Sequence, residues 1–142
     1  MATRKAPKRI ENAHFIAWVD SAVDLGALVN DLKVYTWEKG CECAVVDLRG
    51  GRRAIVAGGS HGISFKLRHS AFVDPFGHRM SYAVIVIDGQ PLRIDRLVCH
   101  THPPPPTGPS ADDIRMLELL EQDESIIFEI NGDADGTIFH RH

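Results

Sequence analysis

The sequence predicts a protein of the α/β class, of the α+β kind, in which a β-rich middle lies between two main helices at about residues 12–32 and 111–122. Two observations support this fold class. Apolar residues recur at spacings of three and four in both flanking segments, as they do along one face of an amphipathic helix. Between these segments, short apolar runs alternate with Gly- and Asp-containing turns, which is typical of strands joined in hairpins.

The first helix is predicted from the spacing of seven apolar residues, which are Phe15, Ile16, Val19, Ala22, Val23, Ala27 and Leu28. Positions three and four apart lie on the same side of a helix, so these residues would form one buried stripe. Gly26 is a point where this helix could break, because glycine lowers helix stability.

The predicted strands follow from short apolar runs bounded by turn residues. They cover residues 43–48, 54–57, 63–67, 80–87, 92–99, 125–130 and 137–140. The turns Arg49–Gly51, Asp88–Gly89 and Asn131–Gly136 connect three pairs of them as hairpins. Residues 69–79, which include Pro75 and Gly77, are predicted to form a loop.

The second helix follows a stiff, exposed loop. Residues 101–109 contain five prolines and a glycine, a composition that excludes a helix or a central strand. After the loop, Ile114, Met116, Leu117 and Leu120 mark an amphipathic helix with acidic residues in its first turn. Ser110 is its expected N-cap.

Length and charge limit the possible classes of protein. The chain has 142 residues and a formal charge of −3, which suits a single domain at residues 11–142 and disfavours nucleic acid as a partner. Residues 1–10 are predicted to be a disordered basic tail. The longest strongly apolar run, residues 82–87, is too short to cross a bilayer, so no membrane partner is expected. An odd number of cysteines and no secretory signal fit a cytoplasmic protein.

The candidate site lies where a predicted strand ends. His100 and His102 are two residues apart, so their side chains would point to the same face of a strand and could contact one metal ion. Asp113, in the first turn of the next helix, could supply a carboxylate as third ligand. Two imidazoles and one carboxylate are a known catalytic zinc set, because the fourth tetrahedral position stays open for water. The pattern therefore points to zinc-dependent hydrolysis.

The same residues resemble the signature of the JAMM metalloproteases, also called MPN-plus or JAB-domain proteins. The segment HTHPPPPTGPSADD, residues 100–113, matches each fixed position of the family pattern His-x-His-Pro, a gap, and Ser-x-x-Asp. The surrounding layout is similar over about residues 12–142. The resemblance implies a compact prokaryotic-type member with a mixed β-sheet and Zn²⁺ held by His100, His102 and Asp113.

The resemblance also assigns catalytic roles. Ser110 would stabilise the oxyanion, and a distal glutamate before an early strand would act as general base. Glu42, directly before residues 43–48, is the first candidate, although the family's glycine shortly after this glutamate is absent here. Glu38 is the second candidate.

The implied activity is that of a zinc metallo-(iso)peptidase, of the kind found among deubiquitinases, acting on a protein or peptide substrate that could end in a ubiquitin-like tail. A catalytically inactive MPN-type binding module is the alternative, and a RadC-like role near DNA is disfavoured by the acidic charge. Cys41, Cys43 and Cys99 could instead form a thiolate site, but ordinary packing of buried cysteines is the favoured interpretation. No feature predicts an oligomeric state.

Overall fold

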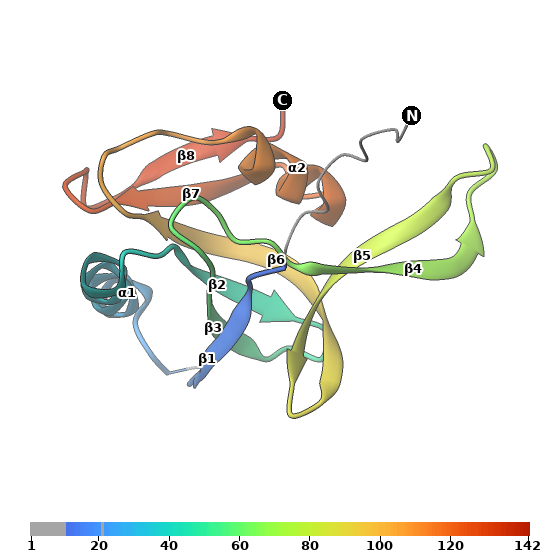
Figure 1. The fold of residues 1–142 in the computed structure, drawn as a ribbon, viewed down its shortest axis with the longest axis horizontal. Coiled ribbons are helices and arrows are strands. Elements are labelled where there is room, and N and C mark those ends of the chain that lie inside the picture. Colours follow the sequence, from blue (N-terminus) through green and yellow to red (C-terminus); the bar gives the residue numbers. More distant parts are fainter. Residues whose placement is uncertain (1–10, 21) are drawn as a thin grey trace, which may run out of the picture.

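The computed structural model describes residues 11–20 and 22–142, so the predicted basic tail lies outside the described residues. Within them, eight strands and two helices form a mixed α+β fold, as predicted (Figure 1). In chain order the elements are β1 (His14–Val19), α1 (Leu25–Lys39), β2 (Cys43–Leu48), β3 (Arg53–Ala57), β4 (Lys66–Val73), β5 (Arg79–Ile87), β6 (Gln90–His102), α2 (Ala111–Leu120), β7 (Glu124–Glu129) and β8 (Thr137–His140).

The long strand β6 is the centre of the sheet. The main order is β1-β3-β2-β6-β5-β4. In addition, β7 pairs with the last residues of β6, and β8 pairs with β7. At its start β6 pairs with β5, along most of its remaining length with β2, and at its end with β7. The β6–β7 pair is parallel whereas the others are antiparallel, which makes the sheet mixed.

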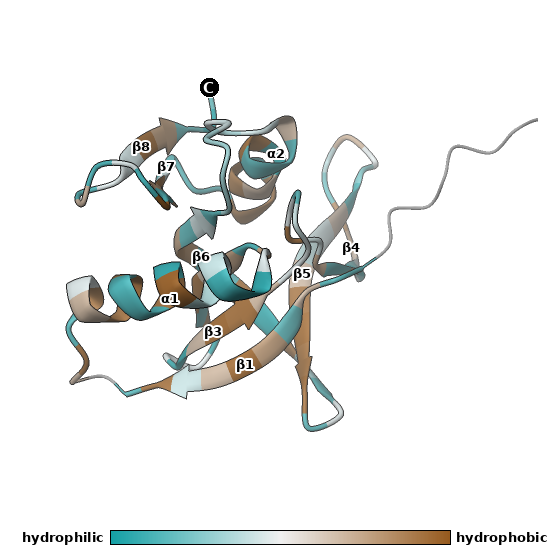
Figure 2. Cartoon of the chain, turned by 60° about the vertical axis from the view of Figure 1, so that its left-hand side comes forward, coloured by the Kyte–Doolittle hydropathy of each residue, from teal (hydrophilic) through white to brown (hydrophobic). Residues whose placement is uncertain are grey.

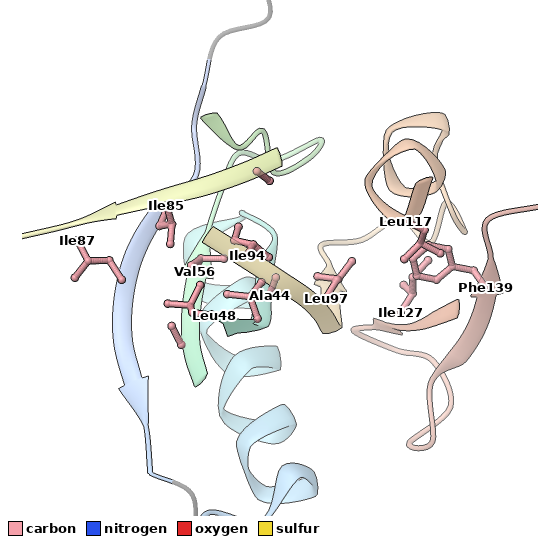
Figure 3. Close-up of a cluster of buried hydrophobic side chains, with 13 residues drawn as sticks. Ala44, Leu48, Val56, Ile85, Ile87, Ile94, Leu97, Leu117, Ile127 and Phe139 are labelled. Carbon is pink, nitrogen blue, oxygen red and sulfur yellow. The ribbon is translucent and has the colours of Figure 1, made fainter. Parts of the chain in front are cut away.

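The two faces of the sheet are covered by different helices. Alternation along β2 sends Cys43 and Val45 to a core shared with α1, and Ala44 and Val46 to a second core that includes Leu117 of α2. Figure 2 shows the apolar strands beside α1, and Figure 3 shows side chains of the second core, with Leu117 of α2 beside Ile127 and Phe139. The end of β6 is therefore covered on both faces.

The prediction of one helix over residues 12–32 is wrong. Residues 14–19 form the strand β1, which pairs with β3, and α1 begins only at Leu25 and continues to Lys39. The segment is rich in aromatic and β-branched residues, which favour strands. Its pairing with β3 stabilises a strand there in place of the predicted helix. The helix starts where the Asp24 side chain accepts a hydrogen bond from the Ala27 N–H. It ends at Gly40, in the left-handed conformation with φ 66°.

The prediction of a loop over residues 69–79 is also wrong at both of its ends. Strand β4 continues to Val73 and β5 begins at Arg79, so that only the tip of the hairpin is a turn. Asp74 holds this tip, since its Oδ1 accepts hydrogen bonds from the N–H groups of Phe76 and His78. The hairpin projects from the body of the molecule (Figure 1).

The predicted strand 63–67 is displaced, since β4 spans Lys66–Val73, whereas the remaining predicted elements agree with the structure to within three residues. The hairpin of β2 and β3, the turn at Asp88–Gly89 and the closing pair β7 and β8 are all present. Strand β6 runs three residues further than the predicted range 92–99 and ends at His102. Helix α2 has Ser110 as its N-cap and acidic residues in its first turn, as predicted.

Candidate metal centre

Two buried histidines lie at the end of β6. His100 and His102 are 2% and 3% exposed, and both side chains lie on the face of the sheet that α2 covers. Thr101, between them, points to the other face, where its hydroxyl pairs with the hydroxyl of Thr36 on α1 and accepts a hydrogen bond from the Cys43 N–H. These contacts fix the strand end beside α1 and β2, and thus the direction of both imidazoles.

Helix α2 places Asp113 against both histidines. Ser110 and Asp113 form a capping box, in which Ser110 Oγ accepts from the Asp113 N–H at 3.1 Å and Asp113 Oδ2 accepts from the Ser110 N–H at 2.9 Å. The carboxylate is thereby held over the strand end. Its Oδ1 lies 3.2 Å from His100 Nε2, and its Oδ2 lies 3.4 Å from His102 Nε2.

Glu42, the residue directly before β2, completes the group. Its backbone pairs with Gly58 and Gly59, which follow β3. Gly58 lies so close to the next loop that a Cβ there would meet the Gly62 carbonyl oxygen at 2.7 Å, so only glycine fits. The Glu42 side chain is 7% exposed, and its Oε1 lies 3.5 Å from His102 Nε2. Glu38, the other candidate, is an exposed residue of α1 outside this group.

The four side chains form a candidate metal site. One potential ligand atom from each of Glu42, His100, His102 and Asp113 lies within 4.8 Å of the other three. The two Nε2 atoms are 3.0 Å apart. In a tetrahedral site with metal–nitrogen distances of about 2.05 Å, two ligand atoms are about 3.3 Å apart, so the spacing suits one small ion.

Burial and neighbouring charged groups shift the pKa values of Glu42, His102 and Asp113. Burial raises the pKa of Glu42 to about 7; His102 acts against this rise, and the carboxylates of Asp113 and Glu129 add to it. Burial also pushes the pKa of Asp113 upwards, but hydrogen bonds from His100 and His102 outweigh it and hold that pKa well below its ordinary value. For His102, burial lowers the pKa, and the bond to Asp113 with the nearby carboxylates reverses the effect. A cation at the centre would relieve the repulsion between carboxylates.

One residue of the site was not found by sequence reasoning. Glu129, the last residue of β7, places Oε1 3.2 Å from His102 Nδ1. Its position beside His102 follows from the parallel pairing of β6 and β7, which the residue pattern does not reveal. In the sequence, Glu129 is only a single acidic residue near the end of the predicted strand 125–130, which does not by itself indicate a site.

The cysteines belong to the core rather than to a ligand set. Cys43 and Cys99 are fully buried in the core under α1, and Cys41 packs against it. In the described part of the chain, the metal-binding group with three or more ligands contains none of the three. Burial raises the pKa of the Cys99 thiol to about 12, which fits an unreactive packing residue.

Comparisons with known proteins do not identify a family for this chain. No protein-family model matches the chain, and neither the curated proteins nor the solved structures gave a significant match. Neither of the two helices in the described residues is long and apolar enough to cross a membrane. The structure thus supports a mixed α+β fold with a candidate metal site of two histidines, a glutamate and an aspartate.

Proposed function

We propose that the chain is a zinc-dependent metallo-(iso)peptidase of the JAMM type. The observation that carries the proposal is the position of Glu42, whose buried carboxylate lies 3.5 Å from His102 Nε2 in one group with His100 and Asp113. This is the arrangement that a hydrolase needs, with metal ligands and a general base on one centre.

Zinc suits the donor set. Imidazole nitrogen and carboxylate oxygen are its usual ligands in catalytic sites, where three protein ligands leave one position open. Here His100, His102 and Asp113 would hold the ion, while Glu42, which directly precedes β2, would remain free to act as general base. When bound, zinc would supply a Lewis acid that acidifies a water molecule and polarises the carbonyl under attack.

Glu42 would move the proton. The carboxylate would take a proton from water and return it to the leaving nitrogen, and burial, which raises its pKa to about 7 in the metal-free chain, favours this role. A carboxyl group at its ordinary pKa would be a weaker base. Burial of Glu42 is therefore part of its proposed catalytic role.

Ser110 would stabilise the oxyanion. Its Oγ already accepts a hydrogen bond from the Asp113 N–H, so the hydroxyl hydrogen is directed elsewhere. The residue is exposed on the side of a cleft that also contains Glu42 and His102. From there the hydroxyl can donate to an oxygen that becomes negative during attack on a carbonyl.

A cleft of about 540 Å³ leads to the proposed centre. Thr36 and Trp37 of α1 form one side, and Pro103, Pro104 and Pro105 form another. The mostly uncharged lining suits an extended peptide, which is why we propose a peptide or isopeptide bond as substrate. A ubiquitin-like tail is the proposed form of the natural substrate.

The binding-module alternative fits the site less well. An inactive relative would not need a buried carboxylate beside the histidine pair, because burying an acidic group costs stability. Glu42 has this position, whereas Glu38 has not. The stability lost by burying Glu42 is explained if its carboxylate takes part in a reaction.

The test is cleavage by zinc-loaded protein of a ubiquitin C-terminal fluorophore conjugate and of a mixed peptide library analysed by mass spectrometry. Glu42→Gln should lower kcat by at least about a hundredfold, the usual size of a general-base effect, with zinc content unchanged. Glu38→Gln is the matched control and should remain active. Full activity of Glu42→Gln, or no cleavage of either probe by the zinc-loaded wild type, would contradict the proposal.

A further inference from the structure

The two histidines at the end of β6 differ in what holds their rings. His102 Nδ1 lies 3.2 Å from Glu129 Oε1. His100 Nδ1 is buried and has no hydrogen-bond partner among the described residues. A metal ion on Nε2 would require the hydrogen of the neutral His102 ring on Nδ1, and the Glu129 carboxylate, which only accepts hydrogen bonds, lies where it can receive that hydrogen. The lone pair of Nε2 is then directed at the centre.

Glu129 is itself held firmly. It pairs in register with His102 at the end of the parallel strands β6 and β7, and its side chain is 14% exposed. The turn after β7 closes against it, because the Gly132 N–H donates to the Glu129 carbonyl oxygen at 3.1 Å. A Cβ at Gly132 would lie 3.0 Å from Glu129 Cβ, so the turn leaves little freedom there.

The same carboxylate oxygen also holds the proline-rich loop. Glu129 Oε1 accepts from the Gly108 N–H at 3.2 Å, in addition to the contact with His102. Gly108 has φ 65°, a conformation that favours glycine, and lies two residues before Ser110. One oxygen atom therefore joins a proposed ligand to the loop that leads to the proposed oxyanion residue.

We propose that Glu129 is a positioning residue that fixes the His102 ring for metal binding and couples the metal centre to the loop of residues 103–110. The inference rests on the proposed zinc site. Carboxylates that orient a ligating histidine make it a stronger ligand, and their removal commonly lowers metal affinity about 10- to 100-fold. Of the two histidines, His102 is the one whose Nδ1 lies against a carboxylate.

The test is zinc affinity, measured by competition with a chromophoric chelator. Glu129→Ala removes both hydrogen bonds and should weaken zinc binding about 10- to 100-fold. Glu129→Gln keeps an acceptor oxygen for both donors but loses the charge, so its loss should be smaller. Glu124→Ala, at the other end of β7, is the matched control, because its side chain is 58% exposed and lies 3.7 Å from His140, away from the metal-site residues.

Two further readouts separate positioning from general damage to the fold. In the zinc-loaded protein, nitrogen NMR should show the His102 Nδ1–H in a hydrogen bond, and Glu129→Ala should remove that hydrogen bond. Hydrogen exchange at the Gly108 amide should become faster in the same variant. If Glu129→Ala does not fold, Glu129→Gln decides by its affinity relative to wild type.

The outcomes distinguish the two proposals. Zinc binding by wild type with unchanged affinity in both Glu129 variants overturns the positioning role and leaves the zinc site intact. Absence of zinc binding in wild type overturns the zinc site, and with it the role given to Glu129.

Discussion

The end of β6 buries polar side chains, whereas the tip of the hairpin of β4 and β5 exposes apolar ones. At the end of β6, His100 and His102 are almost fully buried and surrounded by carboxylates. At the tip of the hairpin, Phe72 and Phe76 are 76% and 84% exposed. Burying polar groups is costly, so the first region is the candidate for binding a ligand. The tip of the hairpin contributes little to the core, whereas the other end of β5 supplies Ala83, Ile85 and Ile87 to it.

The core beside the site should show the largest effect on stability. Leu117 of α2 is fully buried against Ile127 and Phe139 (Figure 3). Leu117→Ala should lower the free energy of unfolding by about 3 kcal/mol, because it removes apolar contacts and leaves a cavity. Chemical denaturation measures the change, with the exposed Glu118→Ala as control. A loss below about 1 kcal/mol would mean that α2 is not packed on the sheet in this way.

The polar group should make metal-free protein sensitive to pH. The Glu42 pKa is about 7 in the folded chain against an ordinary value of 4.5, so the folded state keeps a proton that the unfolded chain has lost. The free energy of unfolding should therefore fall as pH rises from about 4.5 to 7, by up to about 3 kcal/mol from this group. Denaturation of chelator-treated wild type and Glu42→Gln across this range measures it. Equal slopes in both proteins would show that Glu42 has an ordinary pKa.

The hairpin should give the smallest effect. Replacing Phe72 and Phe76 with Ser removes exposed side chains, so the free energy of unfolding should change by less than about 0.5 kcal/mol. Zinc affinity should equal that of wild type. A large loss of stability would show that the tip packs against the body, and the contrast between the two regions would then disappear.

What the sequence could predict depended on local patterns. His100 and His102 share a face because strand residues alternate, and Asp113 sits in a capping box that begins at Ser110. Both relations join residues two or three positions apart, so the sequence alone could indicate them. The pairing of β1 with β3 joins segments about forty residues apart, and the contact of Glu129 with His102 depends on strand register. Local periodicity carries no information about either.

The most direct test of the metal centre is elemental analysis of purified protein after loading with zinc and removal of excess ion. Wild type should hold about one zinc per chain, as expected for a site of this donor set. The double variant His100→Ala, His102→Ala should hold none while keeping the circular dichroism of the folded protein. Wild type without zinc, or a double variant that retains it, would contradict the account.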